Sequence, residues 1–285
     1  MVNTNELTPL DKSTWCPGCG NFGILAAIKN AIVALGLEPH NVLIVGGIGC
    51  SAKDCQWVRT YGFHSLHGRP VPVATGARLA NIKLNVIAVS GDGDGYGIGM
   101  GHFIHAMRRN INITYLVHNN QVYGLTTGQA SPTTERGIIT KSTPDGVIEN
   151  PVDPLTLAIS GGATFVARGY AGDPQHLSKI IAEGIAHKGF AVIDILQPCV
   201  TFNHHNTYEW YKQRVYKLED EKHDVHDKKK AYDKAEEWGD KIPIGVFYKV
   251  NKPTLEDNLP QIKDKPLVEH DIMHIDISKS LKEFI

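Results

Sequence analysis

The chain has 285 residues, of which 42% are hydrophobic and 21% are charged, and this composition excludes collagen-like, disordered and coiled-coil proteins. Its 29 Lys and Arg residues nearly balance its 30 Asp and Glu residues, so no basic field exists for nucleic acid, and we expect no nucleic-acid partner. No run approaches the roughly 20 apolar residues of a membrane-spanning helix, and the polar residues 1–12 lack the features of a secretory signal, so we expect a cytoplasmic protein with no membrane association.

Helical and strand patterns alternate along the first 200 residues. Apolar residues at helical spacing predict a helix from Asn21 to Leu37, and the run 42–45 predicts a buried strand that ends in a glycine-rich turn. Further helices are predicted over 74–81, 100–109, 155–160 and 174–187, and further strands over 86–89, 113–117, 164–166 and 191–196. This order predicts an α/β fold with a doubly wound, mostly parallel sheet, in which ligands bind at the carboxyl ends of the strands.

The character of the chain changes near residue 205. Residues 206–285 are rich in Tyr, Trp and charged side chains, and they include the run Lys228-Lys229-Lys230. We divide the chain into a main domain, 1–205, and a C-terminal arm or small subdomain, 206–285, that packs on a partner. A solvated helical face is an equally reasonable interpretation of this segment.

One glycine-rich turn, Gly91-Asp92-Gly93-Asp94-Gly95, lies between a predicted strand and a predicted helix, where backbone amides would face an anion. Asp92 can supply a hard oxygen ligand, and Asn120 follows the next strand. With a backbone carbonyl and diphosphate oxygens, these groups suit Mg²⁺. An EF-hand calcium site is disfavoured because Phe103 stands where that loop needs Glu. A simple turn without a ligand is the remaining alternative.

A second glycine turn, over residues 47–52, fits the G-x-G-x-x-G/A pattern of dinucleotide-binding proteins. That fold needs an acidic residue about 20 positions later for the ribose, and residues 63–71 contain neither Asp nor Glu. NAD binding is therefore the weaker interpretation. Cys50 inside this turn requires a separate explanation.

The five cysteines suggest a metal site or thiol chemistry rather than disulfides. Cys16 and Cys19 form a C-x-x-C knuckle before a predicted helix, and Cys50 and Cys199 each follow a predicted strand. Four thiolates suit zinc or a 4Fe-4S cluster, and a redox-active C-x-x-C pair is a third possibility. The Gly91–Gly95 turn together with Asn119-Asn120 resembles the diphosphate-binding site of thiamine diphosphate enzymes. This resemblance favours an iron–sulfur cluster, because an oxidising thiamine enzyme must pass electrons on.

Taken together, these motifs resemble the β subunit of the 2-oxoacid:ferredoxin oxidoreductases, which contain thiamine diphosphate and a 4Fe-4S cluster. The resemblance covers about residues 14–205. The motifs that carry it are Cys16-Pro17-Gly18-Cys19-Gly20, Gly47-Ile48-Gly49-Cys50-Ser51, the segment from Tyr61 to Arg69, Gly91-Asp92-Gly93-Asp94, the segment from Asn119 to Gln129, and Gln197-Pro198-Cys199.

The resemblance implies a role for each motif residue. The implied cluster ligands are Cys16, Cys19, Cys50 and Cys199, which leaves Cys55 as a buried thiol. Mg²⁺ would be held by Asp92, Asn120 and the carbonyl of Val122. Thiamine diphosphate would be lined by Ile48, Gly49, Cys50, Ser51, His67, Gly93, Asp94, Gly124 and Leu125, with His64 as a second choice to His67. Lys53 would bind the substrate carboxylate, and Leu125 would shape the substrate pocket.

The resemblance also implies the reaction: a 2-oxoacid and coenzyme A give acyl-CoA and CO₂, and ferredoxin accepts the electrons. Thiamine enzymes further need a glutamate from a pyrimidine-binding domain, and the residues after 199 are too few and too polar for a second such sheet. We therefore expect residues 1–205 to form the diphosphate-binding half, and a separate α subunit to complete the enzyme.

Two other functions stay open from the residues alone. One is a non-oxidative thiamine diphosphate decarboxylase or carboligase, which has no use for four converging thiolates. The other is a zinc-stabilised nucleotide-binding module. Which 2-oxoacid is used does not follow from the sequence, because pyruvate, 2-oxobutyrate and 2-oxoglutarate share the same reacting groups.

Overall fold

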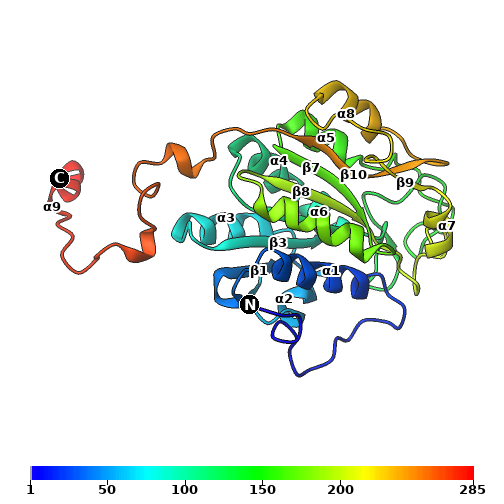
Figure 1. Cartoon of the computed structure of the whole chain (residues 1–285), viewed down its shortest axis with the longest axis horizontal. Helices are drawn as coiled ribbons and strands as arrows, with labels where there is room; N and C mark the ends of the chain where they lie inside the picture. Colours follow the sequence, from blue (N-terminus) through cyan, green and yellow to red (C-terminus); the bar gives the residue numbers. More distant parts are fainter. Residues whose placement is uncertain (1) are drawn as a thin grey trace.

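The molecule is built on one central sheet with helices on both faces (Figure 1). The computed structural model describes residues 2–285. The strands of the sheet are β1 (Val42–Gly46), β2 (Tyr61–His64), β3 (Asn85–Gly91), β4 (Thr114–Asn119), β7 (Phe165–Tyr170), β8 (Ala191–Leu196), β9 (Val215–Lys217) and β10 (Ile242–Lys249). Their order is β2-β1-β3-β4-β8-β7-β10-β9, and only the pairing of β10 with β7 is antiparallel. This arrangement confirms the predicted fold class.

Helices cover the two faces of the sheet separately. On one face α1 (Asn21–Ala34) packs beside α6 (Pro174–Ala186), with the short α2 (Asp54–Trp57) next to β1 and β2. On the other face lie α3 (Pro70–Ala80), α4 (Met100–Arg109), α5 (Pro154–Gly161) and α8 (Lys228–Ala235). Within residues 2–285, no helix is long and apolar enough to cross a membrane.

The central strands are buried on both faces, which explains why they could be predicted as apolar runs. β4 and β8 are buried along their whole length. The predictions missed β2, whose four residues are all exposed, and β10, whose apolar run contains Pro243 and Gly245. They also missed a small hairpin of β5 (Val122–Tyr123) and β6 (Gln129–Ala130) inside the polar segment after β4.

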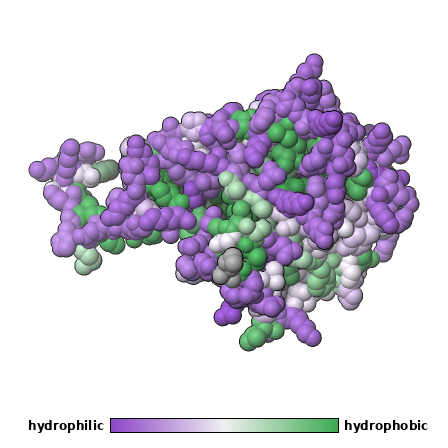
Figure 2. Space-filling model, in the orientation of Figure 1, coloured by the Kyte–Doolittle hydropathy of each residue, from purple (hydrophilic) through white to green (hydrophobic). Residues whose placement is uncertain are grey.

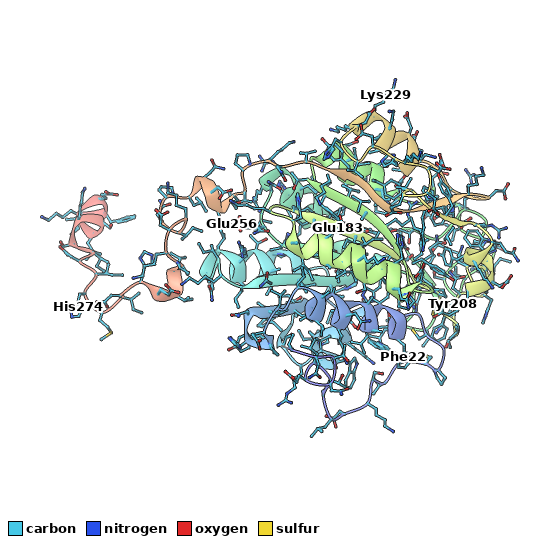
Figure 3. The ribbon with its side chains drawn as sticks, viewed as in Figure 1. Phe22, Glu183, Tyr208, Lys229, Glu256 and His274 are labelled. Atoms are coloured by element: carbon cyan, nitrogen blue, oxygen red, sulfur yellow. The ribbon has the colours of Figure 1, made fainter. Side chains whose placement is uncertain are left out.

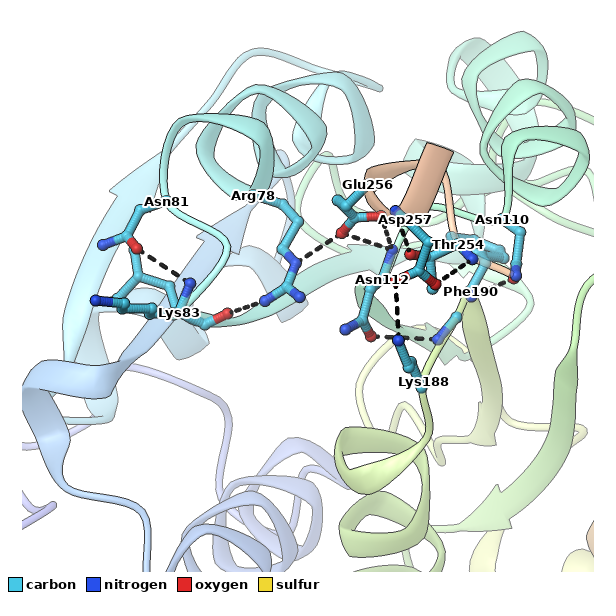
Figure 4. Close-up of polar contacts among 12 residues, drawn as sticks. Arg78, Asn81, Lys83, Asn110, Asn112, Lys188, Phe190, Thr254, Glu256 and Asp257 are labelled. Carbon is cyan, nitrogen blue, oxygen red and sulfur yellow. Dashed lines mark hydrogen bonds and ion pairs between the residues drawn. The ribbon is translucent and has the colours of Figure 1, made fainter. Parts of the chain in front are cut away.

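The chain after residue 205 first joins the sheet and then leaves it. The helix α7 (Tyr208–Lys212) precedes β9, and β10 extends the sheet beyond β7. After β10 the chain is fastened by Glu256, whose Oε1 accepts a hydrogen bond from Arg78 Nε at 2.7 Å and whose carboxylate also accepts from the Asn112 amide (Figure 4).

The final residues extend away from the body of the molecule, as the position of His274 shows in Figure 3. They include the one-turn helix α9 (Ser278–Leu281), which is followed by a 3-10 turn over Lys282–Phe284. Apolar side chains in this last part of the C-terminal arm face solvent and produce green patches among the purple surface (Figure 2). Between residues 267 and 285 these exposed apolar residues are Leu267, Val268, Ile272, Met273, Ile275, Ile277, Leu281, Phe284 and Ile285.

Candidate functional site

Four neighbouring strands carry the predicted site residues to one edge of the sheet. β1, β3, β4 and β8 are consecutive and parallel, so their carboxyl ends lie side by side. The chain continues from these ends into the glycine turn that contains Cys50, into Asp92, into Asn120 and into the segment that contains Cys199. Motifs that are far apart in sequence therefore meet at one place.

A pocket of about 220 Å³ opens at this edge. All nine residues predicted to contact thiamine diphosphate line it, together with Asp92, Asn120 and Val122. The full lining is Ile48, Gly49, Cys50, Ser51, His67, Gly91, Asp92, Gly93, Asp94, Asn120, Val122, Tyr123, Gly124, Leu125 and Thr126. Ser51 Oγ is buried and has no hydrogen-bond partner within residues 2–285, so the pocket contains a polar group that a ligand can satisfy.

Asp94 holds three loops of the pocket together. Its Oδ1 accepts hydrogen bonds from the Gly68 amide at 2.7 Å and from the Ile48 amide at 3.2 Å, and it lies 2.6 Å from His67 Nδ1. Its Oδ2 accepts from Ser90 Oγ at 2.7 Å. The carboxylate therefore fixes the pocket wall, and it leaves His67 Nε2 as the ring nitrogen that can meet a ligand.

The glycines near Asp94 allow this close packing. A Cβ added at Gly47 would overlap Asp94 Oδ2, and a Cβ added at Gly93 would overlap the ring of Tyr123. The Tyr123 hydroxyl in turn donates to the Gly93 carbonyl at 3.1 Å. Both positions thus require glycine for reasons of space.

Asp92 is a buried carboxylate held by two hydroxyl groups. Ser131 Oγ and Thr133 Oγ1 both donate to its Oδ2, the latter at 2.6 Å. Burial raises the pKa of Asp92, and these donors act in the opposite direction. Sequence reasoning missed Ser131 and Thr133 because they lie in the polar segment after β4, where no periodic pattern marks them.

The oxygen donors next to Asp92 suit a hard divalent cation. Asn120 Oδ1 lies 3.1 Å from the Val122 amide nitrogen, which donates to it, and Asn120 Nδ2 donates to Gln197 Oε1 at 2.9 Å. Carboxylate, amide and carbonyl oxygens are the ligands that Mg²⁺ takes in proteins. The chemistry of Asp92, Asn120 and the Val122 carbonyl, which line one pocket, therefore fits a magnesium ion.

Four cysteines gather beside the pocket. A Cβ placed on Gly124 would lie 3.7 Å from Cys199 Sγ and 3.9 Å from Cys50 Sγ, so these two sulfurs flank one backbone position. The Gly20 amide donates to the Pro198 carbonyl at 3.1 Å, and Trp15 Nε1 donates to the Cys50 carbonyl at 2.7 Å. These bonds draw the knuckle containing Cys16 and Cys19 to the other two cysteines.

The thiols are free, and they influence one another. None of the five cysteines forms a disulfide bond. Burial raises the pKa of Cys19 to about 12, and the neighbouring Cys199, Cys50 and Cys16 add to this effect. A thiol with a pKa raised in this way stays protonated at neutral pH and loses its proton only when a cation binds the sulfur. Within residues 2–285, no three Cys, His, Asp or Glu side chains come close enough together to hold a single metal ion.

The remaining predicted residues lie near the pocket but outside it. Lys53 Nζ donates to Thr14 Oγ1 at 3.0 Å. His64 is on the exposed strand β2, where its Nδ1 lies 3.4 Å from Gln56 Nε2. Cys55 Sγ lies 3.1 Å from the Ala52 carbonyl, and burial raises its pKa to about 11. Its charged neighbour is Asp54 rather than another cysteine.

Comparisons with known proteins agree with this geometry. Residues 47–195 match the family of thiamine pyrophosphate enzyme C-terminal TPP-binding domains, and residues 199–264 match the family of C-terminal regions of the pyruvate ferredoxin oxidoreductase beta subunit. The chain is 48% identical over 292 residues to the 2-oxoacid:ferredoxin oxidoreductase subunit beta of Saccharolobus solfataricus, with 94% of this chain and 95% of that protein covered.

A second relative and a solved structure support the same conclusion. The subunit beta of 2-oxoacid:ferredoxin oxidoreductase 1 from Aeropyrum pernix is 51% identical over 261 residues, covering 87% of this chain and 82% of the relative. The solved 2-oxoglutarate:ferredoxin oxidoreductase from Magnetococcus marinus, with 2-oxoglutarate, coenzyme A and succinyl-CoA bound, superimposes with a TM-score of 0.91 at 39% identity. This superposition covers 99% of the present chain and 96% of the solved one.

Proposed function

This chain belongs to the beta subunits of the 2-oxoacid:ferredoxin oxidoreductases, and from that premise we propose that it acts with an alpha subunit to oxidise a 2-oxoacid. In the proposed reaction a 2-oxoacid and coenzyme A give acyl-CoA and CO₂, and the two electrons released pass through a 4Fe-4S cluster to ferredoxin. The S. solfataricus and A. pernix relatives are named for a general 2-oxoacid, so the proposal names that class of substrate.

One observation carries the proposal: β1, β3, β4 and β8 bring the glycine turn, Asp92, Asn120 and Cys199 to one edge of the sheet. Thiamine diphosphate and an electron acceptor have to be neighbours in such an enzyme, and here the pocket and the thiols share Cys50. In open α/β sheets this edge is also where ligands bind.

In the proposed site, bound thiamine diphosphate supplies the nucleophilic carbon that makes loss of CO₂ from a 2-oxoacid possible. Asp92, Asn120 and the Val122 carbonyl would hold the Mg²⁺ that anchors its diphosphate. His67, oriented through Nδ1 by Asp94, would present Nε2 to a diphosphate oxygen. Ile48, Gly49, Ser51 and Gly124 would shape the pocket around the cofactor, and Gly93 provides room for Tyr123.

Two residues of this chain would act on the substrate. Leu125 lines the pocket while 48% of its surface is exposed, so it can shape the space above the cofactor. Lys53 follows Cys50 on the same loop, and its ammonium group would bind the carboxylate of the 2-oxoacid. Its present contact with Thr14 is with a neutral hydroxyl, which a carboxylate can replace.

The cluster would be held by Cys16, Cys19, Cys50 and Cys199. Support comes from the convergence of these thiols from three stretches of chain and from the hydrogen bond of Gln197 Nε2 to Cys19 Sγ at 3.4 Å. Such bonds are typical of sulfurs that ligate iron–sulfur clusters.

The rim of the pocket supports a partner subunit. Two apolar residues of the lining, Ile48 and Leu125, are exposed. Tyr61, Phe63 and Leu66, on the segment that leads to His67, are exposed as well. Exposed apolar groups that surround a ligand site mark a surface that another protein covers. An alpha subunit seated there would supply the pyrimidine-binding half of the thiamine site.

The proposal is tested by preparing the chain anaerobically, alone and with its alpha subunit, and measuring reduction of ferredoxin or a viologen with pyruvate, 2-oxobutyrate and 2-oxoglutarate. We expect reduction that depends on both the 2-oxoacid and coenzyme A, from the complex only. Turnover by the chain alone, or a complex that contains one zinc and no acid-labile sulfide, would refute it.

A pair of matched variants tests whether Asp92 belongs to the thiamine diphosphate site. Asp92→Ala removes the proposed magnesium ligand and is expected to abolish retention of thiamine diphosphate while iron and sulfide stay at wild-type levels. Asp264→Ala makes the same chemical change at an exposed position on the arm and is expected to have no effect. Loss of iron in the Asp92 variant would mean that the two sites have been assigned wrongly.

A further inference from the structure

The segment after the β5–β6 hairpin reaches back to Asp92. Val122 pairs with Ala130 across the hairpin, and Ser131 is the first residue after this paired strand. Thr134 Oγ1 donates to the Gln121 carbonyl at 2.7 Å and accepts from the Ser131 amide at 2.8 Å, which closes a tight turn. The first strand of this short hairpin therefore carries the proposed ligand Val122. The two residues whose hydroxyls contact Asp92, Ser131 and Thr133, follow its second strand.

Both hydroxyls meet the same carboxylate oxygen. Ser131 Oγ and Thr133 Oγ1 donate to Asp92 Oδ2, and within residues 2–285 no other side-chain donor contacts this carboxylate. Two donors on one oxygen fix the rotation of the carboxylate plane. Asp92 is 1% exposed, and both hydroxyl residues are buried, so water does not compete for these positions.

A second acceptor lies behind the Thr133 hydroxyl. Its Oγ1 also lies 2.9 Å from Asn119 Oδ1, and the Asn119 amide group donates to the Asp194 carboxylate at 3.1 and 3.3 Å. A hydroxyl has one proton, and the shorter contact, at 2.6 Å, is with Asp92. With the proton on the Asp92 side, no hydrogen bond joins Thr133 to Asn119, and Asn119 Oδ1 only bounds the space behind the hydroxyl.

We propose that Ser131 and Thr133 are positioning residues that orient Asp92 for its divalent cation. By occupying Oδ2 they leave Oδ1 for the ion, and they keep the carboxylate ready before the cation arrives. This inference rests on the proposed function, because it concerns the magnesium of the thiamine diphosphate site. Outer-shell partners of this kind change metal affinity by about 10–100-fold in other proteins.

The test measures magnesium dependence directly. The alpha–beta complex is stripped of Mg²⁺ and thiamine diphosphate with a chelator, and binding of thiamine diphosphate is followed by anaerobic equilibrium dialysis at increasing Mg²⁺ concentration. We expect Thr133→Val and Ser131→Ala each to raise the Mg²⁺ concentration for half-saturation by at least about tenfold. Thr133→Ser keeps the hydroxyl and is expected to stay within about threefold of wild type.

A matched control separates orientation from general destabilisation. Thr114 is a buried threonine of β4 whose hydroxyl donates to the Gly184 carbonyl at 3.1 Å, away from the pocket. Thr114→Val therefore loses a buried hydroxyl without touching Asp92, and its Mg²⁺ requirement is expected to match that of wild type.

The outcomes distinguish this inference from the proposed function. If the unaltered complex binds thiamine diphosphate with Mg²⁺ but Thr133→Val and Ser131→Ala bind it equally well, the orienting role is wrong and the proposed function stands. If Thr133→Ser is as defective as Thr133→Val, the shape of the side chain matters rather than its hydroxyl, and the inference fails. If the unaltered complex binds no thiamine diphosphate, both are wrong.

Discussion

The side-chain amides of Asn120 and Gln197 are hydrogen-bonded at 2.9 Å, and this contact joins the two halves of the site. Asn120 belongs to the proposed magnesium site. The contact with Asn120 uses Gln197 Oε1, and the Nε2 of the same amide donates to Cys19 Sγ at 3.4 Å and to the Pro198 carbonyl at 2.9 Å. A single buried glutamine therefore spans the distance between the pocket and the thiols.

Replacing Gln197 with Leu is expected to make the reduction potential of the cluster more negative. A hydrogen bond to a ligand sulfur stabilises the reduced, more negative cluster, and loss of about 1 kcal/mol corresponds to a shift of about 40 mV for one electron. Redox titration followed by electron paramagnetic resonance measures the potential. Gln261→Leu on the exposed arm is the control, and an unchanged potential in the Gln197 variant would contradict the contact.

Lys53 is predicted to recognise the substrate carboxylate. Because a hydrogen bond to a charged group contributes about 1.5–3 kcal/mol, Lys53→Gln should raise the KM for the 2-oxoacid by about 10–100-fold. The KM for coenzyme A and the iron content should not change. Lys83→Gln breaks an ion pair with Glu269 on the surface and serves as the control. Equal KM values for the two variants would show that Lys53 has no such role.

Gly47 is predicted to be essential for the pocket because a methyl group there would displace Asp94 Oδ2. Gly47→Ala should therefore disturb the bonds from Asp94 to the three loops and abolish retention of thiamine diphosphate. Gly76, within α3, has open space around it, and Gly76→Ala should leave the cofactor bound and stabilise the helix by about 0.5–1 kcal/mol. Cofactor content and Tm distinguish the two variants, and full retention in Gly47→Ala would contradict the prediction.

Because His187 is buried in its neutral form, the folded protein is expected to lose stability in acid. Burial, with a smaller effect from Lys249, lowers its pKa to about 4, and its Nε2 lies 2.8 Å from Thr164 Oγ1. Because the folded-state pKa lies below the unfolded value of about 6.5, the stabilisation is complete above pH 6.5 and is lost as pH falls towards 4, with about 2 kcal/mol lost by pH 5.

The variant His187→Gln should therefore lose less Tm than wild type between pH 7 and pH 5. The measurement is the Tm of the complex at both pH values. An identical decrease in the two proteins would mean that another group controls the acid sensitivity.

The sequence could predict the site because each of its parts follows a buried strand. The apolar runs of β1, β3, β4 and β8 are continuous, and Cys50, Asp92, Asn120 and Cys199 come soon after them. Once these strands are parallel neighbours, the convergence follows from the fold. Strand positions and right-handed crossovers indicate only that these residues lie at one edge of the sheet. The order of the strands comes from the structure, and the grouping of Cys50 and Cys199 with the N-terminal cysteines rested on the family resemblance.

Other features depend on contacts that no local pattern carries. Ser131 and Thr133 reach Asp92 through a hairpin of two-residue strands, too short to show an alternating pattern. The structure uses the Asp94 carboxylate to fix loops, whereas the sequence indicated only a residue next to the cofactor. Similarly, β10 pairs antiparallel with β7 across a long separation in sequence, and Pro243 and Gly245 weaken its strand pattern.

If the thiamine diphosphate pocket and the four cysteines lie side by side in this chain, electrons from the 2-oxoacid should reach the cluster directly. The most direct measurement is electron paramagnetic resonance of the anaerobic alpha–beta complex mixed with a 2-oxoacid in the absence of ferredoxin. The account predicts the signal of a reduced 4Fe-4S cluster in the wild-type complex and none in Asp92→Ala with its iron intact. A substrate-dependent signal in Asp92→Ala, or none in a wild-type complex that contains both cofactors, would contradict it.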